Sequence, residues 1–352
     1  MIGSVHGGPD DGPLIGHDFS TNASPLGPPP AVAMALQAAE RARYPDPQYR
    51  ALRARLARWH GVAPQLVVPT AGTSEAIRRL TLAAFTQGIR TVWLPQPGYA
   101  DYRCAALALG MLVRDYRSGE VLLRGLAEDI AHTHTLVWLC EPCNPTGQSL
   151  PAAFWSALVH VAARRSLVLA IDRAYEPLRL EGVDPVPLAL ARQAWQCFSP
   201  NKALGLTGVR AGYMLAPAHD AEAWLPRVES LAPSWVLSAE GVAMLDALPA
   251  AATQSCLAQS RRTLAQWAHA QRDALQALGW RQQPSVVPFW LVQPVEQGEA
   301  LRQCMADLRA QGIKLRDATS FGLPGWVRVS AQAPQDQQAL VNAWTRCVRG
   351  AR

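Results

Sequence analysis

One residue stands out because its type is almost absent from this chain of 352 residues. Lys202 and Lys314 are the only two lysines. Lys202 ends the segment Ser199-Pro200-Asn201-Lys202, and Arg210 follows after a glycine-rich stretch. A buried lysine can lose its proton and form an imine with an aldehyde, while a hydroxyl and a guanidinium can bind a phosphate. The scarcity of lysine favours this chemical role over an ordinary surface lysine in a loop.

A second segment has the pattern of an anion-binding site. Thr70-Ala71-Gly72-Thr73-Ser74-Glu75 follows an apolar stretch and precedes a helical one. The free N–H groups at a helix start, together with the hydroxyls of Thr73 and Ser74, can bind a phosphate. The same residues also fit an ordinary helix cap with a glutamate in the first turn. Both interpretations stay open on local grounds.

Further polar or aromatic residues follow other apolar stretches. Asp172 ends such a stretch, where a carboxylate is costly unless it is paired, and a protonated pyridine nitrogen is one possible partner. Tyr175 and Asn144 could bind a ring oxygen, and Tyr99 in Pro97-Gly98-Tyr99 could stack on a flat ring. The local alternatives are a capping or arginine-paired aspartate, a turn at Asn144 and a core tyrosine.

The elements that must position these residues alternate between strands and helices. Strand-like apolar runs lie near residues 66–68, 91–94, 136–139, 167–171, 194–198 and 211–215, with helical stretches between most of them. This alternation predicts an α/β fold with a mostly parallel sheet covered on both faces. Ligands of such sheets bind at the carboxyl ends of the strands, which is where the candidate residues fall.

The two ends of the chain differ from the middle in composition and in the order of the expected elements. Residues 1–30 are rich in Gly, Pro and Asp and predict an ordered arm, followed by helices near 31–42 and 49–60. A long helical region is expected over 238–278, and then a strand near 286–292, a helix near 299–311, strands near 313–316 and 326–330, and a last helix. We therefore expect a large domain over 31–235 and a small α+β domain over 236–352.

Taken in order, the motifs resemble those of fold-type I, class I and II aminotransferases over about residues 17–330. The set is Ala71-Gly72-Thr73, Pro97-Gly98-Tyr99, Asn144-Pro145-Thr146-Gly147, Asp172-x-Ala174-Tyr175, Ser199-x-x-Lys202 and Arg210. The resemblance implies an enzyme that uses pyridoxal 5′-phosphate (PLP). It also implies the aspartate aminotransferase fold, in which a mostly parallel seven-stranded sheet lies between helices and a small α+β domain follows.

The resemblance implies a role for each residue. Lys202 would hold the cofactor as a Schiff base and move the proton at the substrate Cα. Asp172 would pair with the pyridine nitrogen, and Arg328 would clamp a substrate carboxylate. Tyr44 would reach the cofactor phosphate of the other subunit in a homodimer. The other cofactor ligands would be Asn144 and Tyr175 for the ring oxygen, Tyr99 for stacking, and Thr73, Ser74, Ser199 and Arg210 for the phosphate. No metal is expected.

Two branches of the family fit best. His6-Gly7-Gly8, residues 18–29 and residues 44–49 look more like threonine-phosphate decarboxylase, an enzyme of cobalamin side-chain assembly. Histidinol-phosphate aminotransferase is the alternative. In both branches Arg316 would bind the substrate phosphate, with help from Ser20 and Asn22 of the arm. We expect the decarboxylase, while noting that Arg173 stands where the family usually has an acid and that Asn201 replaces a common serine.

The composition limits other classes of function. Hydrophobic residues make up 49% and charged residues 17%, which is typical of a globular chain. Neither a membrane span nor a secretory signal is predicted, and the seven irregularly spaced cysteines, Cys140 and Cys143 among them, favour reduced thiols in the cytoplasm. The net charge of +6 is scattered rather than clustered, which argues against nucleic acid. A PLP-binding protein without activity is the alternative of another class, and the complete motif set argues against it.

Overall fold

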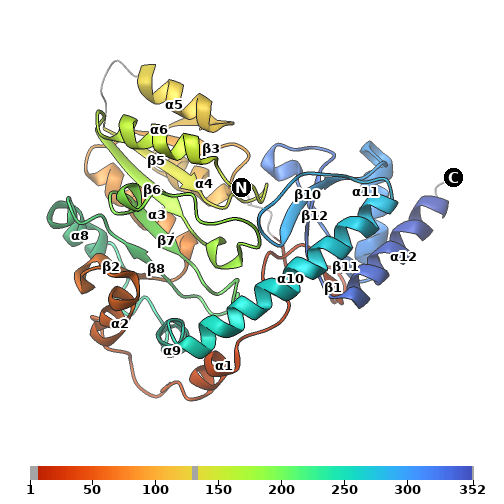
Figure 1. Cartoon of the computed structure of the whole chain (residues 1–352), viewed down its shortest axis with the longest axis horizontal. Helices are drawn as coiled ribbons and strands as arrows, with labels where there is room; N and C mark the ends of the chain where they lie inside the picture. Colours follow the sequence, from red (N-terminus) through yellow and green to blue (C-terminus); the bar gives the residue numbers. More distant parts are fainter. Residues whose placement is uncertain (1–6, 129–133, 351–352) are drawn as a thin grey trace.

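The computed structural model describes residues 7–128 and 134–350, which fold around a large and a small sheet (Figure 1). The large sheet has the strand order β2-β8-β7-β6-β5-β3-β4, and its neighbours run parallel except where β8 pairs with β2 and β7. The strands are β2 (Val67–Thr70), β3 (Thr91–Pro95), β4 (Leu112–Tyr116), β5 (Thr135–Cys140), β6 (Leu167–Asp172), β7 (Trp195–Phe198) and β8 (Gly212–Leu215). This confirms the predicted mostly parallel, seven-stranded sheet.

Successive side chains of the central strands enter two separate cores, because strand residues alternate between the faces of a sheet. Leu136 and Trp138 pack on one face with α3 (Thr73–Thr86), α4 (Ala100–Ala108) and α8 (Ala221–Ser230). Val137 and Leu139 pack on the other face with α5 (Gly119–Glu128), α6 (Ala152–Ala162) and the short α7 (Leu188–Ala191). Both faces are therefore covered, and the ends of the strands are left to carry the site.

The small sheet is antiparallel and has the order β12-β13-β10-β9. Its strands are β9 (Arg281–Gln282), β10 (Phe289–Gln293), β12 (Arg316–Asp317) and β13 (Val327–Ser330), and it packs with α11 (Gly298–Ala310) and α12 (Pro334–Gly350). In the arm, β1 (His17–Asp18) pairs in parallel with β11 (Ile313–Lys314). The α+β part is as expected, and we propose domain limits of 31–235 and 236–352 with the arm at 1–30.

Several elements differ from the sequence-based expectation. The long helical region is two helices, α9 (Ala239–Ala247) and α10 (Ala251–Ala277), because Pro249 between them cannot donate a helical hydrogen bond. The first helix, α1 (Pro30–Gln37), is shorter than predicted, and α2 (Arg50–His60) agrees. Strand β4 was not predicted, because it is an edge strand with charged side chains. The structure also contains three short 3-10 helices within the described residues, η1 (Pro64–Leu66), η2 (Glu176–Leu178) and η3 (Thr319–Phe321).

Two features are absent from the described residues. None of the helices within residues 7–128 and 134–350 combines the length and the apolar character needed to cross a membrane. Over the same residues, no group of three or more His, Cys, Asp or Glu side chains is placed to hold a metal ion.

Candidate active site

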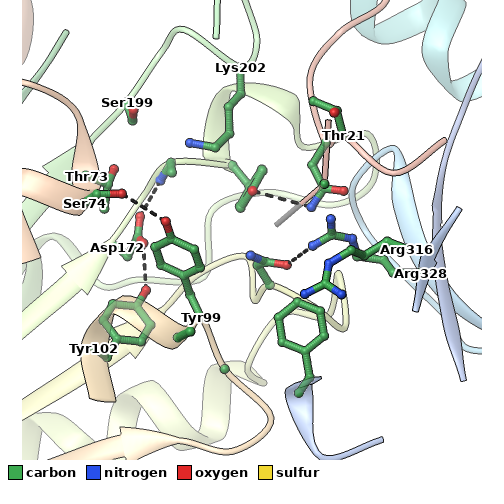
Figure 2. A pocket seen from close by; sticks show the side chains of 18 of the residues that line it. Thr21, Thr73, Ser74, Tyr99, Tyr102, Asp172, Ser199, Lys202, Arg316 and Arg328 are labelled. Carbon is green, nitrogen blue, oxygen red and sulfur yellow. Dashed lines mark hydrogen bonds between the residues drawn. The ribbon is translucent and has the colours of Figure 1, made fainter. Parts of the chain in front are cut away.

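A cavity of about 610 Å³ lies between the carboxyl ends of the large-sheet strands and the small sheet (Figure 2). Every sequence-predicted site residue except Tyr44 lines it. These residues are Ser20, Asn22, Thr73, Ser74, Tyr99, Asn144, Asp172, Tyr175, Ser199, Lys202, Arg210, Arg316 and Arg328. The fold thus brings together residues that the sequence spreads over more than three hundred positions.

Lys202 and Asp172 lie on the large-sheet side of the cavity. Asp172 ends β6 and is only 4% exposed. The Lys202 Nζ lies 5.3 Å from the centre of the Tyr175 ring. Burial lowers the pKa of the Lys202 amine, and this effect outweighs the opposite effect of Asp172. A larger fraction of the amine is therefore neutral than in an exposed lysine. Lys314 does not line the cavity, so Lys202 is the lysine placed for imine chemistry.

Two donors hold the Asp172 carboxylate. The Tyr102 hydroxyl donates to Oδ2 at 2.7 Å, and the Ala174 N–H donates to Oδ1 at 2.9 Å. Burial raises the pKa of Asp172, and these two hydrogen bonds oppose that rise. Sequence reasoning missed Tyr102. Its position three residues after Tyr99, at the start of α4, was the available signal, because such spacing places two side chains on the same face of a helix.

The start of α3 forms a polar cradle. Gly72 has φ +91°, and a Cβ there would lie 3.0 Å from Arg210 Nη2 and 3.6 Å from Ser199 Oγ. Thr73 Oγ1 is buried without a hydrogen-bond partner among the described residues, and Ser74 Oγ contacts the Tyr99 hydroxyl at 3.0 Å. Free N–H groups, hydroxyls and a guanidinium around a space kept open by a glycine fit a phosphate group.

The opposite side of the cavity carries two buried arginines. Arg316 and Arg328 are cross-strand partners on β12 and β13, and Figure 2 shows them side by side. Arg328 donates to Asn144 Oδ1 at 2.6 Å and to the Ser20 carbonyl at 2.8 Å, whereas Arg316 donates to Ser320 Oγ at 2.6 Å. Burial lowers the pKa of Arg328 to about 10, and Arg316 acts in the same direction. Two such cations favour an anionic ligand.

The arm closes the cavity between these two sides. Asn22 Nδ2 donates weakly to the Tyr175 hydroxyl at 3.4 Å, and Asn22 Oδ1 is buried with no partner in the described part of the chain. Ser20 is fixed by Asp18, whose Oδ1 accepts from the Ser20 N–H and hydroxyl at 2.8 and 2.6 Å. Thr21, held by the same carboxylate, also lines the cavity and was not predicted.

Contacts within the arm and with β11 account for the glycines at positions 7 and 8 and for Lys314. A Cβ on Gly7 would come within 2.2 Å of the Ser20 carbonyl oxygen, so only glycine fits there. The Gly8 N–H donates to Ser20 Oγ at 2.9 Å. Lys314 Nζ donates to the Gly8 carbonyl and pairs with Asp10 at 2.7 Å. Lys314 therefore ties down the arm, while His6 lies outside the described residues.

Four other residues noted in the sequence do not line the cavity. Tyr44 is 76% exposed and stacks on Trp235 outside the cavity, so any contact with a cofactor would have to be made in another subunit. Arg173 forms an ion pair with Asp184 and does not line the cavity. Cys140, buried, and Cys143, half-buried, are free thiols.

The arrangement of the sheets and helices is that of the aspartate aminotransferase fold. Histidinol-phosphate aminotransferase from Sinorhizobium meliloti, solved with pyridoxal-5′-phosphate, superimposes with a TM-score of 0.81 at 22% identity, covering 96% of this chain and 92% of that one. L-threonine-O-3-phosphate decarboxylase from Porphyromonas gingivalis gives 0.76 at 23% identity, covering 94% and 99%. At these identities the likeness shows the fold alone.

Sequence comparison places the chain more narrowly. The model of the aminotransferase class I and II family matches residues 15–346. A histidinol-phosphate aminotransferase from Frankia casuarinae is 30% identical over 357 residues, which cover 94% of this chain and 85% of the relative. The chain belongs to the aminotransferase class I and II family, whose enzymes depend on PLP.

Proposed function

We propose that the chain binds PLP in this cavity through Lys202, with Asp172 as the partner of the ring nitrogen. The main support is that a desolvated lysine and a buried carboxylate line the same cavity as the polar cradle at the start of α3. When bound, PLP withdraws electrons from the substrate Cα. Thr73, Ser74, Ser199 and Arg210 are the proposed phosphate ligands.

The remaining cofactor contacts follow from which donors are still available. Asn144 Oδ1 already accepts from Arg328, so its NH2 group is the donor for the ring oxygen. Burial raises the pKa of Tyr175 to about 12, so its hydroxyl stays protonated and can donate to the same oxygen. Tyr99, which lines the cavity, is the proposed stacking residue.

Lys202 has a second task at the substrate Cα. Because burial lowers the pKa of its amine, a larger fraction is neutral near pH 7 than for an exposed lysine. A neutral amine can accept the Cα proton and return it to another carbon. Asp172 would hold the proton at the ring nitrogen.

The paired arginines suggest the substrate class. Arg316 and Arg328 lie in one cavity, and burial lowers the pKa of both guanidinium groups. A phosphate and a carboxylate, or either alone, would be bound by charge-assisted hydrogen bonds at these positions. We propose that the substrate is the phosphate ester of a small amino compound, with its phosphate at Arg316, assisted by Ser20 and Asn22, and any carboxylate at Arg328.

Two reactions of such esters are in question. The similarity to the Frankia enzyme favours transfer of the amino group of histidinol phosphate to a 2-oxo acid, and we propose this as the leading reaction. Decarboxylation of threonine phosphate is the second candidate, which the sequence alone favoured. It is supported by the glycine-containing arm against Ser20 and by two arginines that suit a substrate with both phosphate and carboxylate.

Paired assays test the choice. The holoenzyme is given histidinol phosphate with 2-oxoglutarate, and glutamate is measured; in parallel it is given L-threonine O-phosphate, and carbon dioxide is measured. Lys202→Ala protein serves as the control for uncatalysed reaction. Glutamate formation supports the transfer, whereas carbon dioxide without glutamate selects the decarboxylase. Absence of both products would contradict the proposed substrate class.

We also propose that Tyr44 acts in a homodimer. Tyr44 and Trp235 form an exposed stack, with 4.2 Å between ring centres, beside a groove lined by Arg50 and Arg53. Mixing Lys202→Ala and Tyr44→Phe subunits tests this. A mixed dimer would contain one site with both residues intact, so activity should exceed that of either parent. Unchanged activity in a verified mixed dimer would remove Tyr44 from the site.

A further inference from the structure

Tyr102 is held firmly beside the acid that faces the proposed cofactor. Its side chain is 1% exposed. Its ring stacks on Trp138, with 5.2 Å between ring centres and 27° between planes, and meets the ring of Tyr99 edge-on at 6.0 Å. The hydroxyl donates to Asp172 Oδ2 at 2.7 Å, as drawn in Figure 2. Packing on both sides fixes the donor, so the hydrogen bond does not depend on a mobile side chain.

Few other groups can influence the charge of Asp172. Lys202 favours the ionised carboxylate, and the Ala174 N–H donates to the second oxygen. Three other titratable groups act on Asp172, one each from β5, β7 and the turn after β6. Their pKa values are raised, so they stay neutral. These groups are the thiols of Cys140 and Cys197 and the hydroxyl of Tyr175. Tyr102 is therefore the side-chain donor that offsets the desolvation of the acid.

We propose that Tyr102 is a positioning residue that keeps Asp172 ionised, so that the proton shared with the PLP ring nitrogen resides on the nitrogen. A carboxylate that accepts a hydrogen bond is a weaker base, because the bond stabilises the charged form. Without Tyr102, a buried Asp172 would compete more strongly for that proton. The inference rests on the proposed pairing of Asp172 with the ring nitrogen.

Tyr102→Phe and a matched control, Tyr116→Phe, separate this role from simple packing. Tyr116 is also buried, and its hydroxyl donates to the Trp138 carbonyl at 2.8 Å, but it does not line the cavity. Each variant loses one buried hydrogen bond and should lower Tm similarly. Only Tyr102→Phe should alter Asp172.

The first measurement uses the protein without cofactor. With ¹³C-labelled aspartate, we expect the Asp172 carboxyl titration to move upward by about 1–2 pH units in Tyr102→Phe, because a hydrogen bond to a charged group is lost. It should not move in Tyr116→Phe. An unchanged titration in folded Tyr102→Phe would overturn the inference. If that variant does not fold, 3-fluorotyrosine in place of Tyr102 strengthens the donor and should move the titration downward; no movement would also overturn the inference.

The second measurement uses the holoenzyme with PLP labelled with ¹⁵N at the ring nitrogen. The nitrogen resonance should be that of a protonated ring in the wild type and in Tyr116→Phe, and it should move toward the unprotonated position in Tyr102→Phe. A wild-type resonance from an unprotonated ring would reject the pairing of Asp172 with the nitrogen. If the ring nitrogen is protonated in the wild type and its resonance is the same in Tyr102→Phe, the role of Tyr102 is rejected and the pairing of Asp172 with the nitrogen is kept.

Discussion

The two sides of the cavity are built in different ways. On the cofactor side, Thr73, Asn144, Asp172 and Lys202 each lie at the end of a strand of one sheet or shortly after it, so the strand order of that sheet places them. On the substrate side, Arg328 donates to the carbonyl of Ser20, 308 positions earlier in the chain. The cofactor side is thus formed by residues of one sheet, whereas the substrate side is formed by contacts between the arm and the small sheet.

Both sides combine paired and unpaired buried polar groups. On the cofactor side, Asp172 Oδ2 accepts from the Tyr102 hydroxyl and Ser199 Oγ donates to Asn201 Oδ1, but Thr73 Oγ1 is buried without a partner among the described residues. On the substrate side, Asn22 Oδ1 and Arg328 Nε are buried without partners in residues 7–128 and 134–350. Burying such a group without a partner lowers stability by about 1–3 kcal/mol, and a ligand that supplies the missing hydrogen bond removes this penalty. Thr73 on one side, and Asn22 and Arg328 on the other, can therefore gain their missing partners when ligands bind.

The largest expected effect comes from breaking the cofactor side alone. Lys202→Ala removes the amine but touches neither arginine, so substrate analogues should still bind while turnover falls by about 10⁴-fold, the upper range for a positioned acid–base group. Absorption spectra and steady-state rates measure the two consequences. Near-normal turnover would mean that another group performs the chemistry.

A smaller effect should come from breaking the substrate side. Arg316→Ala removes charge-assisted hydrogen bonds, so kcat/KM for a phosphorylated substrate should fall by about 10- to 150-fold, with the cofactor absorption unchanged. Arg103→Ala is the control, because Arg103 lines the same cavity but pairs with Asp115. An equal loss with the unphosphorylated substrate would contradict a phosphate role for Arg316.

The same contrast explains what the sequence could predict. The residues proposed for the cofactor side, other than Tyr44, line one cavity, and residues such as Asp172 and Lys202 could be proposed from the sequence because they follow apolar runs that are visible locally. Thr21, Ser320 and Tyr102 were missed, because their positions depend on side-chain contacts between distant elements. The exposure of Tyr44 and the pairing of Arg173 with Asp184 are likewise properties of packing, which no local pattern encodes. The scarcity of lysine drew attention to Lys314 as well as Lys202, but no local pattern could show that Lys314 contacts Asp10 and Gly8 of the arm.

The smallest expected effect comes from loosening the arm. Lys314→Met keeps the side-chain length but removes the contacts with Asp10 and the Gly8 carbonyl, so KM should rise by about threefold at unchanged kcat. The remaining partner of Asp10, Arg309, limits the loss. Arg302→Met is the control, because it removes an ion pair with Glu299 on the same domain without touching the arm.

The pH dependence of this effect has a definite sign. Arg309 and Lys314 hold the pKa of Asp10 well below the ordinary 3.8, so the ion pair is present above that value and is lost only as the pH falls toward the lowered pKa. The KM ratio of Lys314→Met to wild type should therefore be constant through neutral pH and should decrease as salt is added, because salt screens exposed charges. A loss of kcat or of the cofactor absorption would instead place Lys314 in the chemistry. Equal KM values in the two methionine variants would show that this contact does not hold the arm.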